Sequence, residues 1–337
     1  MKAYEVCEPT GLDGLVLNQN RAVPRPAHGQ ILVRIRATSL NYRDQGVVRG
    51  TYGYTKFPLI PLSDGAGEVA EIGPGVTQFA VSDRVASNFF VNWTGGPIPA
   101  GVSKNSLGGM VDGVLAEYAL LAETGAIKIP DHLTFEQAAA LPCAGLTAWN
   151  ALAEVGHIKA GETVLALGTG GVACFGLAFA KMHGAQAIVT SSSDEKLAHA
   201  QTLGADHLIN YVSNPDWDAD VLALTGGAGV DHILEVGGPG TLEKSMNAVR
   251  QGGSIYVIGA LGGAGSVNPR VINRKSIRLQ GIHVGSRDMF ERMNRAIALH
   301  KLTPAIDRVF GFDDAKEAYA YQQSGRHIGK IVIAGPA

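Results

Sequence analysis

Six short apolar segments that alternate with helical stretches are the feature of this sequence that most restricts its fold. Most of the segments hold a continuous apolar run, the pattern of a parallel strand that is buried on both faces of its sheet. The segments are TVLALG (163–168), AIVTSS (187–192), HLINY (207–211), HILEVG (232–237), SIYVIG (254–259) and IRLQGIHVG (277–285). Because helical connections separate them, this part of the chain is predicted to form a doubly wound parallel sheet.

The first 130 residues show a second pattern, in which short strands are separated by turns. Residues 30–40 (QILVRIRATSL) alternate apolar and polar side chains, as a half-buried strand does. Residues 67–90 contain two or three further strands, which are interrupted by GPG and SD. An antiparallel, barrel-like β domain is the expected product.

The two patterns, in a chain of 337 residues, predict two domains. One comprises residues 131–285, which hold the parallel strands. From Ser286 onward, amphipathic helices surround one strand, and residues 329–335 (GKIVIAG) form a last strand that can rejoin the first domain. The other domain is therefore expected to combine residues 1–130 with residues 286–337.

Charge and cysteine content exclude several classes of protein. The formal net charge is −2 and no run of Lys and Arg occurs, so a nucleic-acid partner is not expected. Cys7, Cys143 and Cys174 are too few and too widely spaced for a disulfide framework, and they fit a reducing cytoplasm. The apolar run at 172–180 is about half as long as a membrane span, and residues 1–15 lack the apolar core of a signal peptide. A soluble, cytoplasmic protein is expected.

A glycine motif follows the first of the six apolar segments. Gly168, Gly170 and Ala173 have the spacing of the G-x-G-x-x-A dinucleotide fingerprint, placed between a strand and a helix. Gly168 is expected to form the tight turn, and Gly170 to let the backbone approach a pyrophosphate at the helix N-terminus. An ordinary strand-to-helix turn is the alternative, and the surrounding alternation of strands and helices favours the cofactor site.

The end of the second segment indicates which nucleotide is bound. Ser191, Ser192 and Ser193 are hydrogen-bond donors, and Lys196 follows one helical turn later. Such residues suit the 2′-phosphate of NADPH, whereas an acidic residue would hold the 2′-hydroxyl of NADH. Asp194 is the competing acid, but it lies past the strand and is expected to start or cap the following helix. NADPH is therefore the predicted cofactor, although Lys196 can equally be an exposed helix lysine.

Several motifs, in order along the whole chain, resemble those of the medium-chain dehydrogenases/reductases. They include GQILVRIRATSLNYRD, LPCAGLTAWNAL, LGTGGVACFGLAFAK, GADHLINY, GVDHILEVGG and the closing GKIVIAG. Within that superfamily the chain is most similar to the zinc-free quinone (enone) reductases and the related NAD(P)-dependent alcohol dehydrogenases. The resemblance implies a GroES-like catalytic domain built from both chain ends, a Rossmann domain between them, and a homodimer that pairs the outer edge of the last parallel strand.

The positions that hold catalytic zinc in zinc-dependent members of the superfamily correspond to Asn41, Ser63 and Cys143. Asn and Ser are poor zinc ligands, and a single thiolate does not hold an ion that requires three protein ligands. No cysteine lies between Cys7 and Cys143 to form a structural zinc lobe. No zinc is therefore expected, and Ser63 is interpreted as a turn residue before Gly65, where the backbone should bend sharply.

Without a metal, hydrogen-bond donors must stabilise the charge that develops on the substrate oxygen. Asn41 is the first candidate, because its amide takes a former ligand position and, as the resemblance implies, lies near the nicotinamide. Tyr52 matches a cleft tyrosine of the quinone reductases and is expected to orient or protonate the substrate, and Arg43 and Asp44 are expected to pair. Asp64 is a candidate general acid if its pKa is raised, with turn capping as the alternative.

The resemblance also implies a wider set of cofactor contacts, drawn from several loops. Tyr211, at the end of the third apolar segment, matches a position that contacts the 2′-phosphate in the quinone reductases. The predicted set is Asn41, Thr147, Gly168, Gly170, Gly171, Val172, Ser191, Ser192, Lys196, Tyr211, Gly237, Gly259 and Lys330.

These features predict an oxidoreductase that transfers hydride from NADPH to a conjugated carbonyl, such as a quinone or an enone. Conjugate addition is favoured without a Lewis acid, because the charge spreads over an enolate. The alternatives are a zinc-free alcohol dehydrogenase or ketone reductase, and a catalytically idle NADPH-binding protein. An acyl-CoA-linked enoyl reductase is disfavoured, since no basic cluster for the CoA phosphates is evident.

Overall fold

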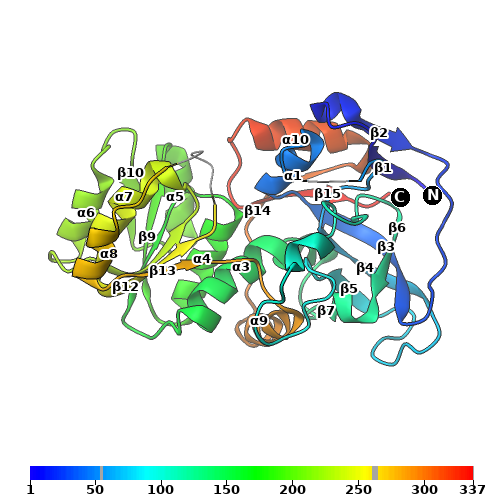
Figure 1. Cartoon of the computed structure of the whole chain (residues 1–337), viewed down its shortest axis with the longest axis horizontal. Helices are drawn as coiled ribbons and strands as arrows, with labels where there is room; N and C mark the ends of the chain where they lie inside the picture. The colour runs from blue at the N-terminus through cyan, green and yellow to red at the C-terminus, as the bar shows by residue number, and fades with distance from the viewer. Residues whose placement is uncertain (54–55, 260–264, 337) are drawn as a thin grey trace. The chain divides into compact units, whose positions relative to one another are not determined.

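The chain folds into two compact units, which are described separately here (Figure 1). The computed structural model describes residues 1–53, 56–259 and 265–336. Unit 1 comprises Met1–Leu146 and Gly285–Ala337, and unit 2 comprises Thr147–Val284. The first unit thus continues past residue 130, because helix α2 (Phe135–Ala139) packs on strands of unit 1.

Unit 2 is a sheet of six parallel strands with helices between them. The strand order is β10-β9-β8-β11-β12-β13, which is the 3-2-1-4-5-6 order of a Rossmann sheet. The strands are β8 (Thr163–Ala166), β9 (Gln186–Ser191), β10 (His207–Asn210), β11 (Val230–Glu235), β12 (Val249–Val257) and β13 (Arg278–Gly281). The helices that connect them are α4 (Gly171–Met182), α5 (Asp194–Thr202), α6 (Trp217–Leu224), α7 (Pro239–Ala248) and α8 (Pro269–Lys275). The predicted doubly wound sheet is confirmed.

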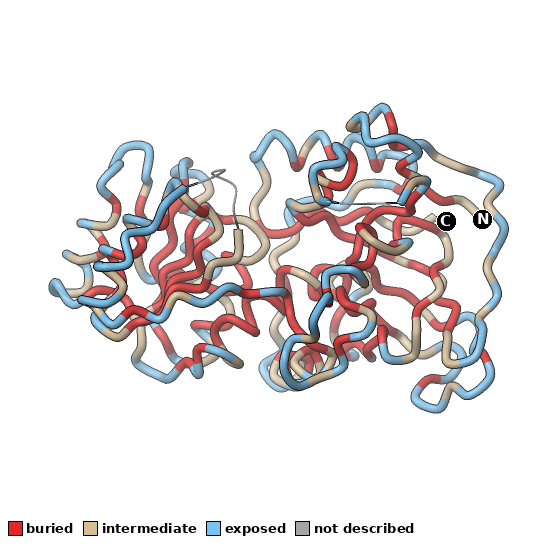
Figure 2. Tube along the Cα trace, viewed as in Figure 1, coloured by how far each residue is buried: buried red, intermediate tan, exposed pale blue. Residues whose placement is uncertain are grey.

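Burial explains why the apolar runs of unit 2 become central strands. Val164, Leu165, Ile233 and Ile255 are fully buried on β8, β11 and β12, and Figure 2 shows this continuous buried layer along the strands. Neighbouring residues on one strand point to opposite faces, so a run with no polar alternation requires cover on both sides. The helices supply that cover.

Unit 1 contains the barrel-like sheet of a GroES-like domain. Its main sheet has the order β14-β15-β3-β4-β5-β7, β6 also pairs with β3, and β1 pairs with β2. The strands are β1 (Ala3–Val6), β2 (Leu15–Asn18), β3 (Gln30–Ser39), β4 (Asp64–Ile72), β5 (Arg84–Ser87), β6 (Tyr118–Ala122), β7 (Ala126–Lys128), β14 (Ile306–Phe310) and β15 (Lys330–Ala334). Besides α2, the helices include α1 (Tyr42–Val48), α9 (Arg287–His300) and α10 (Ala315–Gln323).

The last strand of the chain lies beside the third. β15 runs antiparallel to β3, with Val332 opposite Ser39 and Ala334 opposite Ala37. Ile331 and Ile333 are fully buried in the same apolar core as Ile31 and Val33 of β3, so the pairing is held by core packing as well as by the backbone ladder. This pairing brings the start of β15 next to the end of β3, where α1 begins.

The sharp bend that the sequence predicts near Gly65 lies earlier in the chain. Leu62, fully buried, adopts a left-handed backbone with φ of 68°, whereas Gly65 is part of strand β4. A Cβ on Gly65 would lie 2.9 Å from the side chain of Val114. The glycine is therefore needed for close packing rather than for a turn.

No helix among the described residues is long and apolar enough to cross a membrane.

Candidate active site

The glycine motif forms an open turn at the carboxyl end of β8. Gly168 has a positive φ of 79°, and Gly170 is the extended N-cap of α4. A Cβ built on Gly168 or Gly170 meets nothing within 4 Å, so the space in front of the turn is free. The first N–H groups of a helix have no partner within the helix, and here the residue that precedes α4, Gly170, carries no side chain. This arrangement suits a pyrophosphate.

The ends of β9 and β10 bring together residues that are predicted to bind the 2′-phosphate of the cofactor ribose. Ser191 ends β9, and its carbonyl oxygen accepts a hydrogen bond from the backbone N–H of Tyr211 at 3.0 Å. Tyr211 is 42% exposed, so its ring is available to a ligand. Ser192 is exposed beside them. The three residues lie at the carboxyl edge of the sheet, as the sequence predicts.

The competing acid at this edge has a partner within the protein. α5 begins at Asp194, as predicted, and its N-cap is Ser193. Asp194 Oδ1 accepts a hydrogen bond from Asn210 Nδ2 at 2.6 Å. The Ser193 hydroxyl oxygen accepts from the backbone N–H of Lys196 at 3.4 Å, which places that lysine one turn into the helix.

Glu235, a residue that sequence reasoning missed, organises two further loops at the same edge. This buried side chain accepts hydrogen bonds from the backbone N–H groups of Gly237 at 2.9 Å and Gly238 at 3.0 Å. The backbone carbonyl oxygen of Glu235 accepts from Gly259 N at 3.2 Å. Of the two predicted cofactor contacts, Gly237 is thus held by the carboxylate of Glu235 and Gly259 by the backbone of the same residue. The sequence signal that could have identified Glu235 is an acidic residue at the end of an apolar strand, followed closely by two glycines.

In unit 1, polar side chains gather around the start of α1. We call this set the Asn41 group, which consists of Asn41, Arg43, Asp44, Tyr52, Asp64 and Lys330. Asn41 is the N-cap of α1, and its backbone N–H donates to Asp44 Oδ2 at 2.7 Å. The carbonyl oxygen of Asn41 accepts from Asp44 N at 3.0 Å. This reciprocal cap fixes the backbone of Asn41.

Lys330, at the start of β15, fixes the side chain of Asn41. Its Nζ is buried and donates to Asn41 Oδ1 at 2.6 Å and to the carbonyl oxygen of Leu40 at 2.6 Å. Asp64 Oδ2 lies 3.8 Å from the same nitrogen. An ammonium group only donates, so the amide of Asn41 must turn its oxygen towards Lys330.

The amide nitrogen of Asn41 is left without a hydrogen-bond acceptor. Nδ2 is buried, and no described residue accepts from it. A buried donor that stays unpaired costs about 1–3 kcal/mol, and such a group calls for a ligand, a water molecule or a catalytic role. The Asn41 group therefore presents one oriented N–H donor that a ligand oxygen can satisfy.

Arg43 connects α1 to Tyr52 and to the segment at Leu107. Its Nε lies 3.3 Å from Asp44 Oδ1, which confirms the predicted pair. Nη1 donates to the Tyr52 hydroxyl oxygen at 3.1 Å, and Nη2 donates to the carbonyl oxygen of Leu107. The guanidinium also lies over the rings of Tyr52 and Phe89, at 4.8 and 4.5 Å from their centroids. Because the Tyr52 oxygen already accepts from Arg43, its own proton is free to donate elsewhere.

Ser63 and Cys143, two of the positions predicted to correspond to zinc ligands, form hydrogen bonds with Asp64. The Ser63 hydroxyl donates to Asp64 Oδ1 at 2.6 Å, and the backbone N–H of Cys143 donates to Asp64 Oδ2 at 3.0 Å. Within the described ranges, no set of three or more His, Cys, Asp or Glu side chains is placed to hold a metal ion. With an amide and a hydroxyl at two of its positions, this donor set does not fit catalytic zinc.

Burial changes the acidity of two groups in this region. It raises the pKa of Asp44 to about 6, against the opposing charge of Arg43 and the N–H of Asn41. It also raises the pKa of the Cys143 thiol well above its usual range, with a further contribution from Asp64. Cys143 is therefore a poor nucleophile.

The structure separates the predicted site residues into two sets. Asn41, Tyr52, Asp64 and Lys330 lie together in unit 1, where Lys330 contacts Asn41. The remaining residues lie in unit 2, where most occupy loops at the carboxyl edge of the sheet, and Thr147 is buried in the short helix α3 (Leu146–Trp149). They are Thr147, Gly168, Gly170, Gly171, Val172, Ser191, Ser192, Lys196, Tyr211, Gly237 and Gly259.

Comparisons of the sequence identify the family. Residues 27–131 match the family model "Alcohol dehydrogenase GroES-like domain", and residues 171–299 match "Zinc-binding dehydrogenase". The chain is 41% identical over 335 residues to a zinc-type alcohol dehydrogenase-like protein of Schizosaccharomyces pombe, covering 97% of this chain and 96% of that protein. It is 29% identical to the quinone oxidoreductase of Homo sapiens, with 95% and 93% covered.

Comparisons of the fold agree. A crystal structure of a putative alcohol dehydrogenase from Sinorhizobium meliloti 1021 is 42% identical, with a TM-score of 0.93 and coverage of 99% of this chain and 98% of that one. The structure of mycobacterial Rv1454c complexed with NADPH is 28% identical, with a TM-score of 0.84 and coverage of 99% and 100%. The chain belongs to the medium-chain dehydrogenase/reductase superfamily, and it is an oxidoreductase of the alcohol dehydrogenase and quinone oxidoreductase type.

Proposed function

We propose that this protein is a zinc-independent, NADPH-dependent reductase of conjugated carbonyl compounds, such as enones or quinones. The observation that carries the proposal is the amide of Asn41, whose Nδ2 is buried, oriented by Lys330 and without an acceptor among the described residues. It takes the position of a metal ligand in zinc-dependent relatives. A fixed donor in a dry environment stabilises developing negative charge without a metal ion.

The cofactor is proposed to bind at the carboxyl edge of unit 2. NADPH, when bound, supplies the hydride. Gly168 and Gly170 leave room for its pyrophosphate, and Ser191, Ser192 and Lys196 would hold the 2′-phosphate. The hydrogen bond between Asp194 and Asn210 supports this choice over NADH, because it engages the nearest carboxylate. A relative of this fold has been crystallised with NADPH.

In unit 1, the substrate oxygen is proposed to accept a hydrogen bond from Asn41 Nδ2. Lys330 keeps this amide in one orientation and adds a positive charge behind it. Tyr52, whose oxygen accepts from Arg43, is the proposed proton donor. Both oxygens of Asp64 accept hydrogen bonds from Ser63 and Cys143, so we assign Asp64 a bracing role rather than that of a general acid.

A zinc-free alcohol dehydrogenase is the second candidate, because several relatives carry that name. Reduction of an isolated ketone concentrates charge on one oxygen, whereas conjugate addition spreads it over an enolate. A single amide donor offers less stabilisation than a metal ion with its full charge. This physical argument favours the conjugated substrate.

The rate of NADPH oxidation with matched substrates distinguishes the conjugated-carbonyl reductase from the alcohol dehydrogenase. We expect turnover with 2-cyclohexenone or benzoquinone, and turnover at least about tenfold slower with cyclohexanone, after exhaustive chelation of metals. Faster reduction of cyclohexanone would favour the alcohol dehydrogenase. Loss of activity on chelation, restored by zinc, would reject the metal-free mechanism. Tight NADPH binding without turnover would indicate an idle binding protein.

We also propose a homodimer. β13 is the last strand of its sheet, and its outer edge pairs with no strand of the described residues. Exposed edges favour association, and a two-fold axis would pair β13 with its copy. Sedimentation at micromolar concentration should give twice the 35.2 kDa mass of the chain, and a monomer there would reject the dimer.

A further inference from the structure

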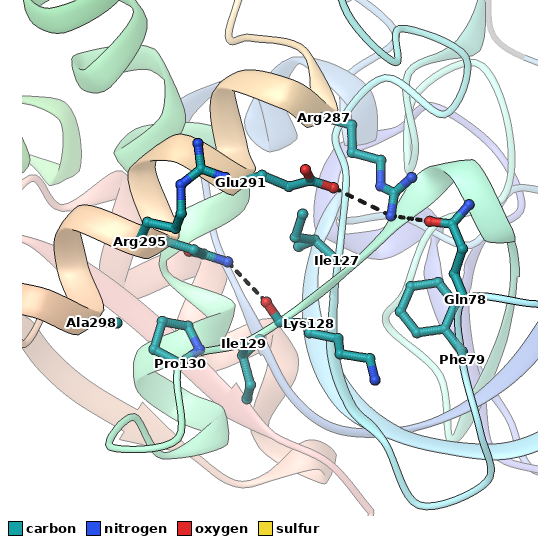
Figure 3. A pocket seen from close by; sticks show the side chains of 11 residues that line it. Gln78, Phe79, Ile127, Lys128, Ile129, Pro130, Arg287, Glu291, Arg295 and Ala298 are labelled. Atoms are coloured by element: carbon teal, nitrogen blue, oxygen red, sulfur yellow. Dashed lines mark hydrogen bonds and ion pairs between the residues drawn. The ribbon is translucent and has the colours of Figure 1, made fainter.

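A cavity of about 430 Å³ opens in unit 1 beside α9, and none of its lining residues belongs to the Asn41 group (Figure 3). One wall is the face of α9 that carries Arg287, Glu291 and Arg295, which are spaced four residues apart. The opposite wall comes from β7 and the turn at residues 78–79. Cavities of this size hold small organic ligands.

The cavity has an apolar floor. Phe79, Ile127 and Ile129 are buried side chains that line it, and Pro130 and Ala298 extend the same surface. Figure 3 shows Ile127 between Glu291 and Gln78, and Pro130 and Ala298 below Arg295. This floor offers no side-chain hydrogen bond, so it favours a ligand with a small apolar body.

Charges around the cavity leave one cation available. Lys128 is paired with Asp83 at 2.9 Å, and Arg287 is paired with Glu291 at 3.4 Å. Arg295 is exposed, and it has neither a hydrogen bond nor an ion pair with any residue that the structure describes. A guanidinium pairs with a carboxylate through two parallel hydrogen bonds, and its single charge balances that of a monoanion.

Two buried polar atoms beside the cavity lack partners. Asn294 is 7% exposed, and its Nδ2 donates to the carbonyl oxygen of Lys128 at 3.0 Å, which fixes the amide orientation. Its Oδ1 then finds no donor in the described ranges, and Arg287 Nε finds no acceptor there. Unpaired buried groups of this kind are costly. A ligand with a hydroxyl group would supply the donor that Asn294 lacks.

We propose that this cavity is a second binding site, for a small hydroxylated carboxylate with a branched apolar chain. The carboxylate pairs with Arg295, the chain lies on Ile129 and Ala298, and the hydroxyl donates to Asn294 Oδ1. The site shares no residue with the Asn41 group, so the inference is independent of the proposed function.

Calorimetric or NMR titration of the full-length protein tests the site with three matched compounds. 2-Hydroxy-4-methylpentanoate should bind with a dissociation constant on the order of 1 mM, a normal value for so small a ligand. 4-Methylpentanoate, which lacks the hydroxyl, should bind roughly three- to tenfold more weakly. The neutral 2-hydroxy-4-methylpentanamide should bind at least about tenfold more weakly, because it loses the pair with Arg295.

Variants assign the binding to this cavity. Arg295→Gln should weaken the hydroxy acid about tenfold, and Asn294→Leu should abolish the preference for the hydroxy acid over 4-methylpentanoate. Arg270→Gln, at an exposed arginine of unit 2, is the matched control and should bind like the wild type. Equal affinity for acid and amide, wild-type affinity of Arg295→Gln, or no binding at about ten times the expected constant would each overturn the proposal.

Discussion

The cofactor loops of unit 2 and the Asn41 group of unit 1 are built in opposite ways. In unit 2, glycine turns expose backbone N–H groups, and a Cβ on Gly168 or Gly170 meets nothing within 4 Å. In unit 1, the polar contacts join side chains that are distant in sequence, such as Asn41 and Lys330, which are 289 residues apart. A backbone site is encoded locally and tolerates many side-chain changes, whereas a side-chain network depends on single atoms.

Removal of the Asn41 amide is the strongest test of whether the side-chain network depends on single atoms. Asn41→Ala deletes the one oriented donor that is proposed to polarise the substrate, so turnover should fall roughly ten- to a thousandfold, as for loss of one oxyanion donor. The affinity for NADPH at unit 2 should change much less. Steady-state kinetics with an enone, together with a separate fluorescence titration of NADPH, measure the two effects.

The control for this variant is Asn20→Ala, at an exposed asparagine of unit 1. It should leave turnover and cofactor affinity at wild-type values. If Asn41→Ala kept full turnover, the polarising role would pass to Tyr52 and the central claim about the Asn41 group would fail.

Stability should also depend on pH through the Asn41 group. Burial raises the pKa of Asp44 from 3.8 to about 6. The folded protein therefore holds this proton more tightly than the unfolded chain does. The stabilisation is complete below about pH 4 and is lost as the pH rises towards 6, by up to about 3 kcal/mol. Urea unfolding across this range should show the stability of the wild type fall relative to that of Asp44→Asn as the pH rises.

Asp83 supplies a comparison of opposite sign within the same unit. A hydrogen bond from Lys128 lowers the pKa of Asp83. Its stabilisation should therefore be present above about pH 4 and be lost as the pH falls. The effect should be small, since Lys128 is largely exposed and solvent weakens the pair. Parallel pH profiles for Asp44→Asn and Asp83→Asn would contradict the assignment of Asp44.

Local pattern explains which parts of this molecule could be predicted from its sequence. The parallel sheet follows from the apolar runs, and the start of α5 at Asp194 follows from its capping residues. The bend at Leu62 gave no signal, because a leucine with positive φ is held there by packing that no local pattern records. The contact between Lys330 and Asn41 depends on the pairing of β15 with β3, so its partner could not be identified from the neighbouring residues.

Replacement of Lys330 probes how far the network acts through Asn41. Lys330→Met keeps the length of the side chain but removes the donor that orients the amide. Turnover should fall roughly tenfold or more, with a smaller change in KM. In an Asn41→Ala background the same replacement should have little further effect, because its target atom is gone.

Two comparisons complete this test. Lys330→Arg, which retains the charge and the donors, should recover part of the turnover. Lys316→Met, at an exposed lysine of α10, should have no effect. Full additivity of Lys330→Met and Asn41→Ala would show that the lysine acts elsewhere, for instance on the cofactor as the sequence predicts.

At the edge of unit 2 the expected effect is limited to cofactor affinity, because one cation adds to a site made largely of backbone. The 2′-phosphate is the main difference between NADPH and NADH, and Lys196 lies one turn into α5, behind the Ser193 cap. Lys196→Ala should weaken NADPH about tenfold, the value of one hydrogen bond to a charged group, and leave NADH almost unchanged. Lys159→Ala, at an exposed lysine of the same unit, is the control and should alter neither affinity. Titration of the wild type and the two variants with NADPH and with NADH measures these affinities.

Equal losses of affinity for NADH and NADPH would mean that Lys196 supports the fold of the loop and does not bind the phosphate. Tighter binding of NADH than of NADPH by the wild type would assign the ribose contact to Asp194.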